Sequence, residues 1–442
     1  MDRNDGRRLE SIPVHRVNRS NIKMVKDDIF KAIRSAQFIA IDLEMTGLGP
    51  RVSVRTKMEE RYQMYKLVAN LRSIVSVGFS FFSRGEQNDR ILYYKASVYD
   101  VLLTEAEAFT VDPSSLQFLV QHGTDLNQWI TNGVMFKKRS DDSLNTIFNH
   151  IFESGASLFL HNGLIDMMFI YHNFYLPLPP TCSEFLANLS DLYQPTDAKN
   201  IPKAYQTAII DTKYIADKQA GLPASFLEYL FRRCRRDNLR NGDVSVNVEF
   251  KQSDGEDVSV IQSRISDAFW DGNYDRDNFK HICPRFASFG FCPKHNTCPL
   301  DHDVEVVLDK EDFDKIKKSK GVKRPHDPST SSDNNGEHNS DEKTSSNSND
   351  LGCHNAGMDA FMTGFVALYL NAKVLHNQNR IPPELVGRFP VANSEYPLLI
   401  RTEQHIKRDD LHHVEKLLVI QRARALRFGE FKVVEDTLIN IS

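Results

Sequence analysis

The feature that most constrains the fold is an apolar run, "FIAIDLEM", which carries acidic residues at alternate positions, Asp42 and Glu44. Alternate side chains of a β-strand point to the same face of a sheet, so the two carboxylates would lie side by side. Two neighbouring carboxylates repel each other, which costs free energy unless a positively charged group lies between them. Carboxylate oxygens suit hard divalent cations such as Mg²⁺. The run therefore predicts a central strand whose acidic pair either faces solvent or binds a metal.

Residues 36–230 alternate between strand-like and helix-like patterns. Apolar runs with few polar interruptions predict strands, at residues 38–45, 73–82, 90–99, 156–163 and 208–216. Recurring apolar residues at helical spacing predict helices, at residues 115–133 and 166–175. This alternation predicts an α/β domain with a mixed sheet.

The pattern changes after about residue 242 and resumes at Leu351. A cysteine cluster and a basic segment come first, and the tract Pro328–Asp350 then contains no Ala, Val, Leu, Ile, Met, Cys, Phe, Tyr or Trp. Such a tract cannot bury enough apolar surface to order itself. Beyond it, residues 356–375 predict a long helix, and the C-terminal stretch predicts a strand followed by an amphipathic helix.

Two further acids stand at the start of predicted helices. Asp166 follows a buried strand and a polar turn in "LHNGLID", and Asp359 lies five residues after His354 in "CHNAGMDAFMTG". Each acid alone has a structural alternative, because carboxylates often cap a helix or compensate its dipole in the first turn. Asp211, in "IIDTKY", also follows a strand and offers a different alignment of the same motif, although no helix start is evident there.

The order D-x-E, D, D, with a histidine five residues before the last acid, resembles the DEDD superfamily of 3′-to-5′ exonucleases in its histidine subclass. The resemblance implies an RNase H-like mixed sheet flanked by helices. It also implies one site for two Mg²⁺ ions about 4 Å apart, which is formed by Asp42, Glu44, Asp166 and Asp359. His354 would act as the general base, and hydrolysis would release nucleoside 5′-monophosphates.

A shared site joins the two flanks of the cysteine cluster into one domain. Residues 1–245 and 351–442 are then the two parts of the nuclease domain, residues 246–306 are an insertion with a zinc finger (core 277–304), and residues 307–350 are a basic and disordered linker.

Near the acids, we expect His161 and Asn162 to shape a turn, with substrate contact as the alternative. Thr46 and Gly47 are expected to let a 3′-terminal nucleotide approach the backbone.

Longer strings narrow the resemblance to the poly(A)-specific deadenylases: "EERYQMYKLVANLRSIVSVGFSFF", "SLQFLVQHGTDLNQWITNG" and "HNAGMDAFMTG". This resemblance implies trimming of oligoadenylated or extended 3′ tails on small nuclear and other non-coding RNAs, in the nucleoplasm, Cajal bodies or nuclear speckles. Homo-oligomers are common among related deadenylases. An RNA-binding zinc-finger adaptor with a scaffold-like nuclease domain is the alternative, and a DNA 3′ exonuclease is a third possibility.

The cysteine cluster has the spacing C-x8-C-x5-C-x3-H, formed by Cys283, Cys292, Cys298 and His302. Three thiolates and one imidazole complete a closed tetrahedral Zn²⁺ site, and the metal would supply the folding free energy of so short a segment. The spacing resembles the CCCH finger family, which commonly binds single-stranded RNA. Phenylalanines at 286, 289 and 291 either stack on unpaired bases or pack over the metal.

Two segments are locally basic, although the whole chain has a net charge of −4. In Lys315–Arg324, six of ten residues are basic, which predicts a nuclear localisation signal for an import receptor or, alternatively, a patch that attracts phosphates. In Arg232–Arg240, five arginines form a second patch, which a solvated helix face explains equally well.

The remaining composition is that of a soluble intracellular protein, with 40% hydrophobic and 26% charged residues. No signal peptide and no membrane-spanning run is evident in the sequence. Six cysteines without a secretory signal favour a reducing compartment. A nuclear Mg²⁺-dependent 3′ exoribonuclease with adenosine preference is therefore the leading hypothesis from the sequence.

Overall fold

The computed structural model describes most of the chain. The described residues are 11–50, 52–53, 55–86, 88–193, 207–240, 242–251, 257–294, 297–319, 355–378, 381–391, 394, 396–400 and 411–428. Three predicted features lie partly or wholly outside them: His354, the tract Pro328–Asp350 and the second half of the basic segment Lys315–Arg324. Among the described helices, none combines the length and the apolarity needed to cross a membrane.

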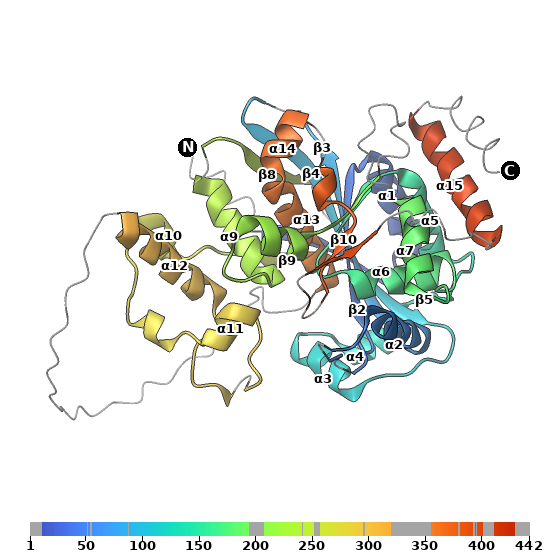
Figure 1. Cartoon of the computed structure of the whole chain (residues 1–442), viewed down its shortest axis with the longest axis horizontal. Coiled ribbons are helices and arrows are strands. Elements are labelled where there is room, and N and C mark those ends of the chain that lie inside the picture. Colours follow the sequence, from blue (N-terminus) through green and yellow to red (C-terminus); the bar gives the residue numbers. More distant parts are fainter. Residues whose placement is uncertain are drawn as a thin grey trace, which may run out of the picture.

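A nine-stranded mixed sheet forms the centre of the molecule, with the order β7-β6-β2-β3-β4-β1-β9 and with β5 and β8 paired to β4 (Figure 1). Its strands are β1 Ser11–Val17, β2 Phe38–Met45, β3 Ile74–Arg84, β4 Ile91–Glu105, β5 Val134–Phe136, β6 Ser157–Leu160, β7 Ile209–Asp211, β8 Ser245–Phe250 and β9 Val258–Gln262. The strands β2, β3 and β4 are antiparallel, whereas β6 and β7 continue the sheet parallel to β2. This is the strand order of the RNase H-like fold, so the predicted mixed sheet is confirmed.

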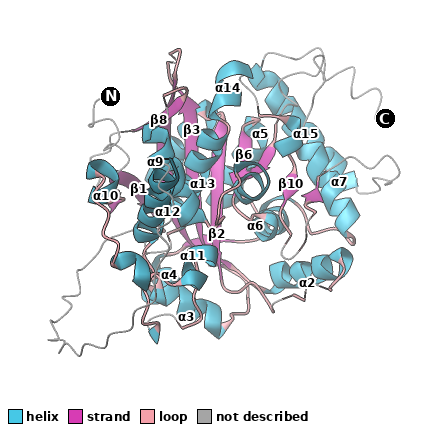
Figure 2. Cartoon of the chain, turned by 60° about the vertical axis from the view of Figure 1, so that its left-hand side comes forward, coloured by secondary structure: helices cyan, strands magenta, loops and turns pink. Residues whose placement is uncertain are grey.

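Helices cover both faces of the sheet and bury two separate apolar cores. On one face lie α1 (Ile22–Ser35), α5 (Ser143–Ser154), α6 (Leu164–Ile170) and α7 (Cys182–Leu192), with α2 (Met58–Leu71) beside them. On the other face, α13 (Ala356–Leu370) packs against β2 and β3, and α9 (Leu227–Arg240) packs beside it (Figure 2). The long predicted helix after the polar tract therefore returns to the central strands.

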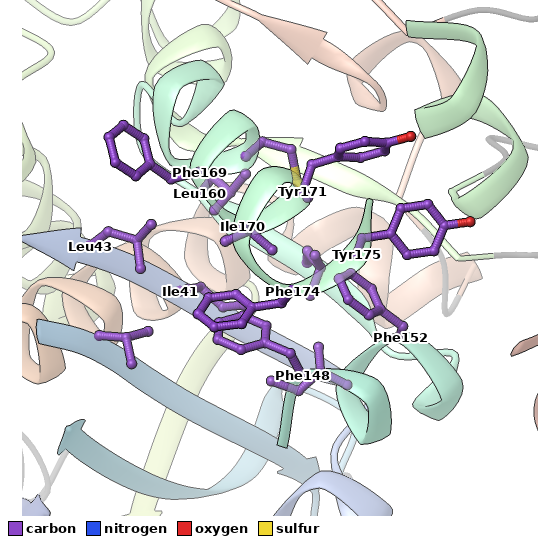
Figure 3. Close-up of a cluster of buried hydrophobic side chains, with 14 of the residues drawn as sticks. Ile41, Leu43, Phe148, Phe152, Leu160, Phe169, Ile170, Tyr171, Phe174 and Tyr175 are labelled. Atoms are coloured by element: carbon purple, nitrogen blue, oxygen red, sulfur yellow. The ribbon is translucent and has the colours of Figure 1, made fainter. Parts of the chain in front are cut away.

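The alternation along β2 decides where its acids point. Ile39, Ile41 and Leu43 belong to the core under α5 and α6, and Figure 3 shows Ile41 and Leu43 directed toward the aromatic rings of that core. Ala40 belongs to the opposite core with the side chains of α13. Because Asp42 and Glu44 share the face of Ala40, both acids are directed toward α13.

The sheet continues past residue 245, where the insertion was expected to begin. β8 pairs in parallel with β4, and β9 pairs antiparallel with β1, so the segment that leaves the sheet begins only after Gln262. It contains the helices α10 (Asp267–Asp271), α11 (Pro284–Phe289) and α12 (Val304–Ser319). Residues 307–319, expected as linker, are thus part of a helix that packs on α9.

Two of the predicted elements differ from the observed ones, one in its continuity and one in its type. The helix expected over residues 115–133 is divided into α3 (Pro113–Gln121) and α4 (Leu126–Asn132), since Gly123 adopts a left-handed φ of 95° between them. The strand expected over residues 208–216 ends at Asp211, and helix α8 (Thr212–Ile215) follows directly. At the C-terminal end, β11 (Leu398–Leu399) and α15 (Leu411–Phe428) agree with the predicted strand and amphipathic helix.

Candidate active site

Three of the predicted acids meet where β2 passes under the first turn of α13. Asp42 and Glu44 come from the strand, and Asp359 comes from the helix. Each offers a carboxylate oxygen, and these oxygens all lie within 4.8 Å of one another. The β2–β3 register shifts between Glu44 and Met45, so the regular ladder ends at the acidic pair. Residues more than 300 positions apart thus form one cluster.

A glycine allows the helix to lie this close to the sheet. Gly78 of β3 is the direct partner of Asp42 in the ladder. A Cβ atom at Gly78 would lie 1.7 Å from the carbonyl oxygen of Ala356 at the start of α13, a distance that no side chain tolerates. The missing side chain therefore brings the first turn of α13 onto the strand and Asp359 toward the acids of β2.

The fourth acid, Asp166, approaches the cluster from α6. It raises the pKa of Asp42, and its own carboxylate interacts with the backbone N–H of Leu43, between the two acids of β2. Burial raises the pKa of Asp166 to about 7, while the interaction with Leu43 opposes that rise. Asp166 is not one of the three acids whose oxygens lie within 4.8 Å of one another. It therefore lies beside the group of three.

The electrostatics of this acidic cluster are those of a cation site. Burial, followed by the charges of Asp359, Asp166, Glu44 and Asp100, raises the pKa of Asp42 well above its ordinary value. Several carboxylates in one cluster repel one another unless a cation neutralises them. All the donor atoms are oxygens, which fits a hard divalent cation and not a thiolate-preferring metal.

The alternative acid, Asp211, has a structural role. Its carboxylate accepts the backbone N–H groups of Asn162 at 3.1 Å and Gly163 at 2.8 Å, and it caps α8 through Lys213 at 3.0 Å and Tyr214 at 3.3 Å. These four bonds oppose the effect of burial, which raises the pKa of Asp211 to about 6. Asp211 thus holds the turn before α6. The sequence offers no signal for this role, because no helix start is evident at Thr212.

The neighbouring turn residues behave as the sequence suggests. The Nδ1 atom of His161 lies 2.9 Å from the hydroxyl oxygen of Thr212, and burial lowers the pKa of His161 to about 3, so this ring stays neutral. Asn162 adopts a left-handed φ of 56°, which an asparagine accepts more readily than most residues. Both residues shape the turn that leads into α6.

Thr46 and Gly47 have packing roles in the structure, and the approach of a nucleotide to their backbone stays a prediction. The Thr46 hydroxyl donates to Thr110 O at 2.9 Å and accepts the Ser73 N–H at 3.0 Å, and the residue is fully buried. A Cβ atom at Gly47 would lie 2.7 Å from the Cβ of Asp112. The space beside Gly47 is therefore occupied by the start of α3, and Thr46 fastens the loop that follows the acidic strand.

The cysteine cluster is brought together as predicted. Cys283, Cys292, Cys298 and His302 offer ligand atoms that all lie within 4.8 Å of one another. The backbone N–H groups of Phe286 and Arg285 lower the pKa of the Cys283 thiol, because they stabilise its thiolate. Three thiols and an imidazole at these distances suit a structural zinc ion.

The structure also separates the three phenylalanines of the finger. Phe286 stacks on His302 at 5.0 Å and contacts Phe226, which comes from the nuclease domain. Phe289 is 68% exposed, Phe291 is 37% exposed, and the guanidinium of Arg285 lies over the Phe289 ring. Packing over the cluster is therefore correct for Phe286, whereas the other two rings remain accessible to a ligand.

The second basic patch is not a surface for nucleic acid. Arg233 and Arg236 of α9 are buried and paired with Asp312 of α12, at 2.8 Å and 3.0 Å. Further pairs join Arg232 to Glu305 at 3.0 Å and Arg236 to Asp309 at 2.9 Å. Neither expected role, phosphate binding or a solvated face, fits buried arginines. The signal that was missed is the row of acids on α12, spaced four and three residues apart.

Comparison with known proteins agrees with this geometry. The family model described as CAF1 family ribonuclease matches residues 17–145 and 137–367. The pre-piRNA 3′-exonuclease trimmer of Bombyx mori is 26% identical over 155 residues, which are 31% of this chain and 29% of that protein. The poly(A)-specific ribonuclease PARN of Xenopus laevis is 28% identical over 139 residues, which are 28% of this chain and 22% of that protein. The chain thus spans less than a third of the length of these relatives.

Among solved structures, the Mg²⁺- and Mn²⁺-bound form of S. pombe Pop2p aligns with a TM-score of 0.39 and 17% identity, covering 51% of this chain and 82% of that one. The family match itself extends over most of the chain. It includes the elements that carry Asp42, Glu44, Asp166 and Asp359. This protein therefore belongs to the CAF1 family of ribonucleases.

Proposed function

We propose that this protein is a Mg²⁺-dependent 3′-to-5′ exoribonuclease that removes adenosine tails from RNA. The observation that carries the proposal is the meeting of Asp42, Glu44 and Asp359 within 4.8 Å. One relative is named a pre-piRNA 3′-exonuclease trimmer, and another is named a poly(A)-specific ribonuclease, so both names describe enzymes that act on RNA. These names support RNA as the substrate class.

The residues divide the chemical work by position. Asp42, Glu44 and Asp359 would hold the metal, with Asp166 beside them. Bound Mg²⁺ supplies an activated water and stabilises charge on the scissile phosphate and the leaving 3′ oxygen. His354, which lies outside the described residues, precedes Asn355 at the start of α13 and would accept the proton from that water.

Two features support the finer parts of the proposal. The exposed Phe289 and Phe291 offer stacking surfaces for unpaired bases. The lysines at the end of α12, Lys315, Lys317 and Lys318, are exposed and accessible to an import receptor, which supports a nuclear location. We further propose that small nuclear and other non-coding RNAs with oligoadenylated tails are the substrates.

The test is a product assay on RNAs that differ only in the 3′ tail, with Mg²⁺ or with EDTA. We expect 5′-AMP from an oligo(A) tail, little product from other tails, and none in EDTA. The variant Asp42→Ala should be inactive, while Asp28→Ala, a change of a half-exposed acid on α1, serves as the matched control. Equal degradation of oligo(A) RNA and DNA would refute the RNA specificity.

The RNA-binding adaptor remains the second candidate, because the exposed rings of the finger favour RNA contact independently of catalysis. An adaptor would bind oligo(A) RNA with the same affinity in wild type and Asp42→Ala and would release no nucleotide from either. That outcome would replace the enzyme by the adaptor.

For nuclear location, a fluorescent fusion should leave the nucleus when Lys317 and Lys318 are changed to Ala, and unchanged import would remove this part of the proposal.

A further inference from the structure

Asp100 lies in the same row of the sheet as the acid Asp42. The β-ladder places Asp42 of β2 opposite Gly78 of β3, and Gly78 opposite Asp100 of β4. All three positions therefore face α13, with the glycine between the two carboxylates. The Cβ of Asp100 would lie 3.1 Å from a Cβ built on Gly357, the second residue of α13. The start of the helix is thus placed between Asp42 and Asp100.

Asp100 is bonded to the residue that caps this helix. The side-chain amide of Asn355 donates from Nδ2 to Oδ2 of Asp100 at 2.7 Å. The other atom of the same amide, Oδ1, accepts the backbone N–H of Met358 at 2.9 Å, which makes Asn355 the N-cap of α13. The backbone N–H of Gly357 also interacts with the Asp100 carboxylate. Asp100 therefore orients the cap from the sheet side, and both ends of the Asn355 amide are used.

The position of this cap decides the position of the cluster. Asp359 lies one residue after Met358, in the same first turn, and shares the site with Asp42 and Glu44. α13 joins the sheet after an insertion, so no short connection fixes its register against β2. Contacts between the helix start and the sheet must supply that register.

We propose that Asp100 is a positioning residue, which orients Asn355 and thereby holds the first turn of α13 where Asp359 completes the metal site with Asp42 and Glu44. This inference rests on the proposed function. Residues that do not bind the metal but orient its ligands typically have large effects. Their removal lowers metal affinity or activity by about 10–100-fold. A purely structural cap would instead affect stability alone.

The test compares Asp100→Ala, Asp100→Asn and Asn355→Ala with Asp142→Ala. Asp142 is the matched control because it caps α5, whose N-terminus it joins through the Asn145 N–H at 2.9 Å, and because it is not part of the cluster. For each full-length variant, the free energy of unfolding, kcat and KM on oligo(A) RNA, and the Mn²⁺ dissociation constant by electron paramagnetic resonance are measured.

We expect Asp100→Ala and Asn355→Ala to lower kcat and Mn²⁺ affinity by at least about 10-fold, with KM changed by less than about twofold. Asp100→Asn still accepts the bond from Asn355 and should recover most of both losses. Asp142→Ala should lose stability by about 1 kcal/mol, as a lost cap does, but keep kcat and Mn²⁺ affinity.

The inference is overturned if Asp100→Ala binds Mn²⁺ and turns over RNA like the Asp142→Ala control. Should Asp100→Ala fail to fold, Asn355→Ala, which leaves the carboxylate in place, decides the question by the same measurements. A wild-type protein without metal-dependent trimming would refute the proposed function instead, and the Mn²⁺ dissociation constants would still show whether Asp100 positions the site.

Discussion

Single residues decide how much free energy the acidic cluster costs when no cation neutralises it. Burial and four neighbouring carboxylates raise the pKa of Asp42 well above its ordinary value, so its ionised form is unfavourable in the folded chain. The acidic cluster is therefore electrostatically complementary to a cation, whereas its carboxylates disfavour one another in the protein alone. Stability and activity are expected to respond in opposite directions when a charge is removed from it.

The variant Asp42→Asn separates these two effects. Asparagine has nearly the same shape without the charge, so we expect the Tm in EDTA to rise by at least about 2 °C. Trimming should fall by at least about 100-fold, because the charge proposed to bind the metal is gone. Calorimetry and the oligo(A) assay measure the two quantities. A variant that is both less stable in EDTA and still active would contradict the assignment of Asp42.

The pH dependence of stability provides a second check at Asp166. Its pKa is raised from 3.8 to about 7, so its contribution to stability is fully present below pH 3.8 and is lost as the pH rises through 7. In EDTA, wild type should therefore lose stability relative to Asp166→Asn as the pH rises through this interval. Urea unfolding of both proteins at several pH values measures the difference. A constant difference would mean that Asp166 is not buried among the acids.

At the scale of elements, α9 and α12 join the inserted finger to the nuclease domain through buried ion pairs. Asp312 is almost fully buried and accepts from Arg233 and Arg236. Burying such charges costs desolvation free energy, and removal of one partner leaves the others uncompensated. The pairing therefore fixes how the insertion is docked, even if its net contribution to stability is small.

Removal of the Asp312 carboxylate should consequently destabilise the folded protein. We expect Asp312→Ala to lower the free energy of unfolding by about 3–5 kcal/mol, the usual effect of breaking a buried pair. Asp237→Ala is the control, since Asp237 pairs with the same Arg233 but is 37% exposed, and its loss should cost about 1 kcal/mol or less. Denaturant titration of both variants decides between this account and a solvated patch, for which the two losses would be equal.

The C-terminal helix α15 stabilises the domain by donating hydrogen bonds to carbonyl groups at the ends of other helices. Arg424 donates to Phe152 O near the end of α5 and to Leu192 O at the end of α7, at 2.8 Å and 2.7 Å. Lys416 donates to Phe174 O and Tyr175 O at the end of a π-helical turn, at 3.3 Å and 2.9 Å. The last carbonyls of a helix have no partners within it, and cations stabilise that end. Figure 1 shows α15 lying beside α5 and α7.

Arg424→Met should therefore destabilise the domain although it is far from the acids in sequence. Loss of bonds from a charged donor to buried carbonyls predicts a decrease of about 2–4 kcal/mol in the free energy of unfolding. Arg422→Met, a change of an exposed residue on the same helix, should cost less than about 0.5 kcal/mol. Equal stability of the two variants would show that α15 does not fasten these helix ends.

At the scale of the whole molecule, the finger and the nuclease domain meet around Phe226. A Cβ at Gly290 would lie 2.6 Å from the Phe226 ring, and Phe286 contacts the same ring. The finger is therefore packed against the domain while Phe289 stays exposed. Local unfolding of the finger should weaken RNA binding without removing the central sheet.

The variant Cys292→Ser tests this division. Loss of a proposed zinc ligand should unfold the finger, because a bound metal would supply its folding free energy. We expect affinity for oligo(A) RNA to fall by about 5–100-fold, the range for one lost stacking contact, and kcat to stay within about twofold. Phe289→Ala, which keeps every zinc ligand, should give the same loss of affinity. An unchanged affinity in both variants would exclude RNA binding by the finger and leave a protein-contact or purely structural role.

Local patterns were sufficient to predict most of the fold and the candidate ligands. Alternation along "FIAIDLEM" placed Asp42 and Glu44 on one face of β2, and the spacing of Cys283, Cys292, Cys298 and His302 predicted a zinc site whose ligands do converge. Both depend on periodicity or spacing within one segment, which the sequence specifies directly. The insertion boundary was misplaced, since nothing local in β8 or β9 says which strand each will pair with.

What the sequence alone determined is the chemistry: oxygen ligands on one strand, thiolates in one segment and an acid at the start of each of two helices. Only the tertiary structure decided which charges meet. It paired the arginines of α9 with the acids of α12, used Asp211 as a cap, and placed α13 on Gly78 so that Asp359 reached β2. The physical reason is that burial and pairing depend on neighbours distant in sequence. The residue type alone does not specify whether a charged side chain binds a metal, caps a helix or forms a buried ion pair.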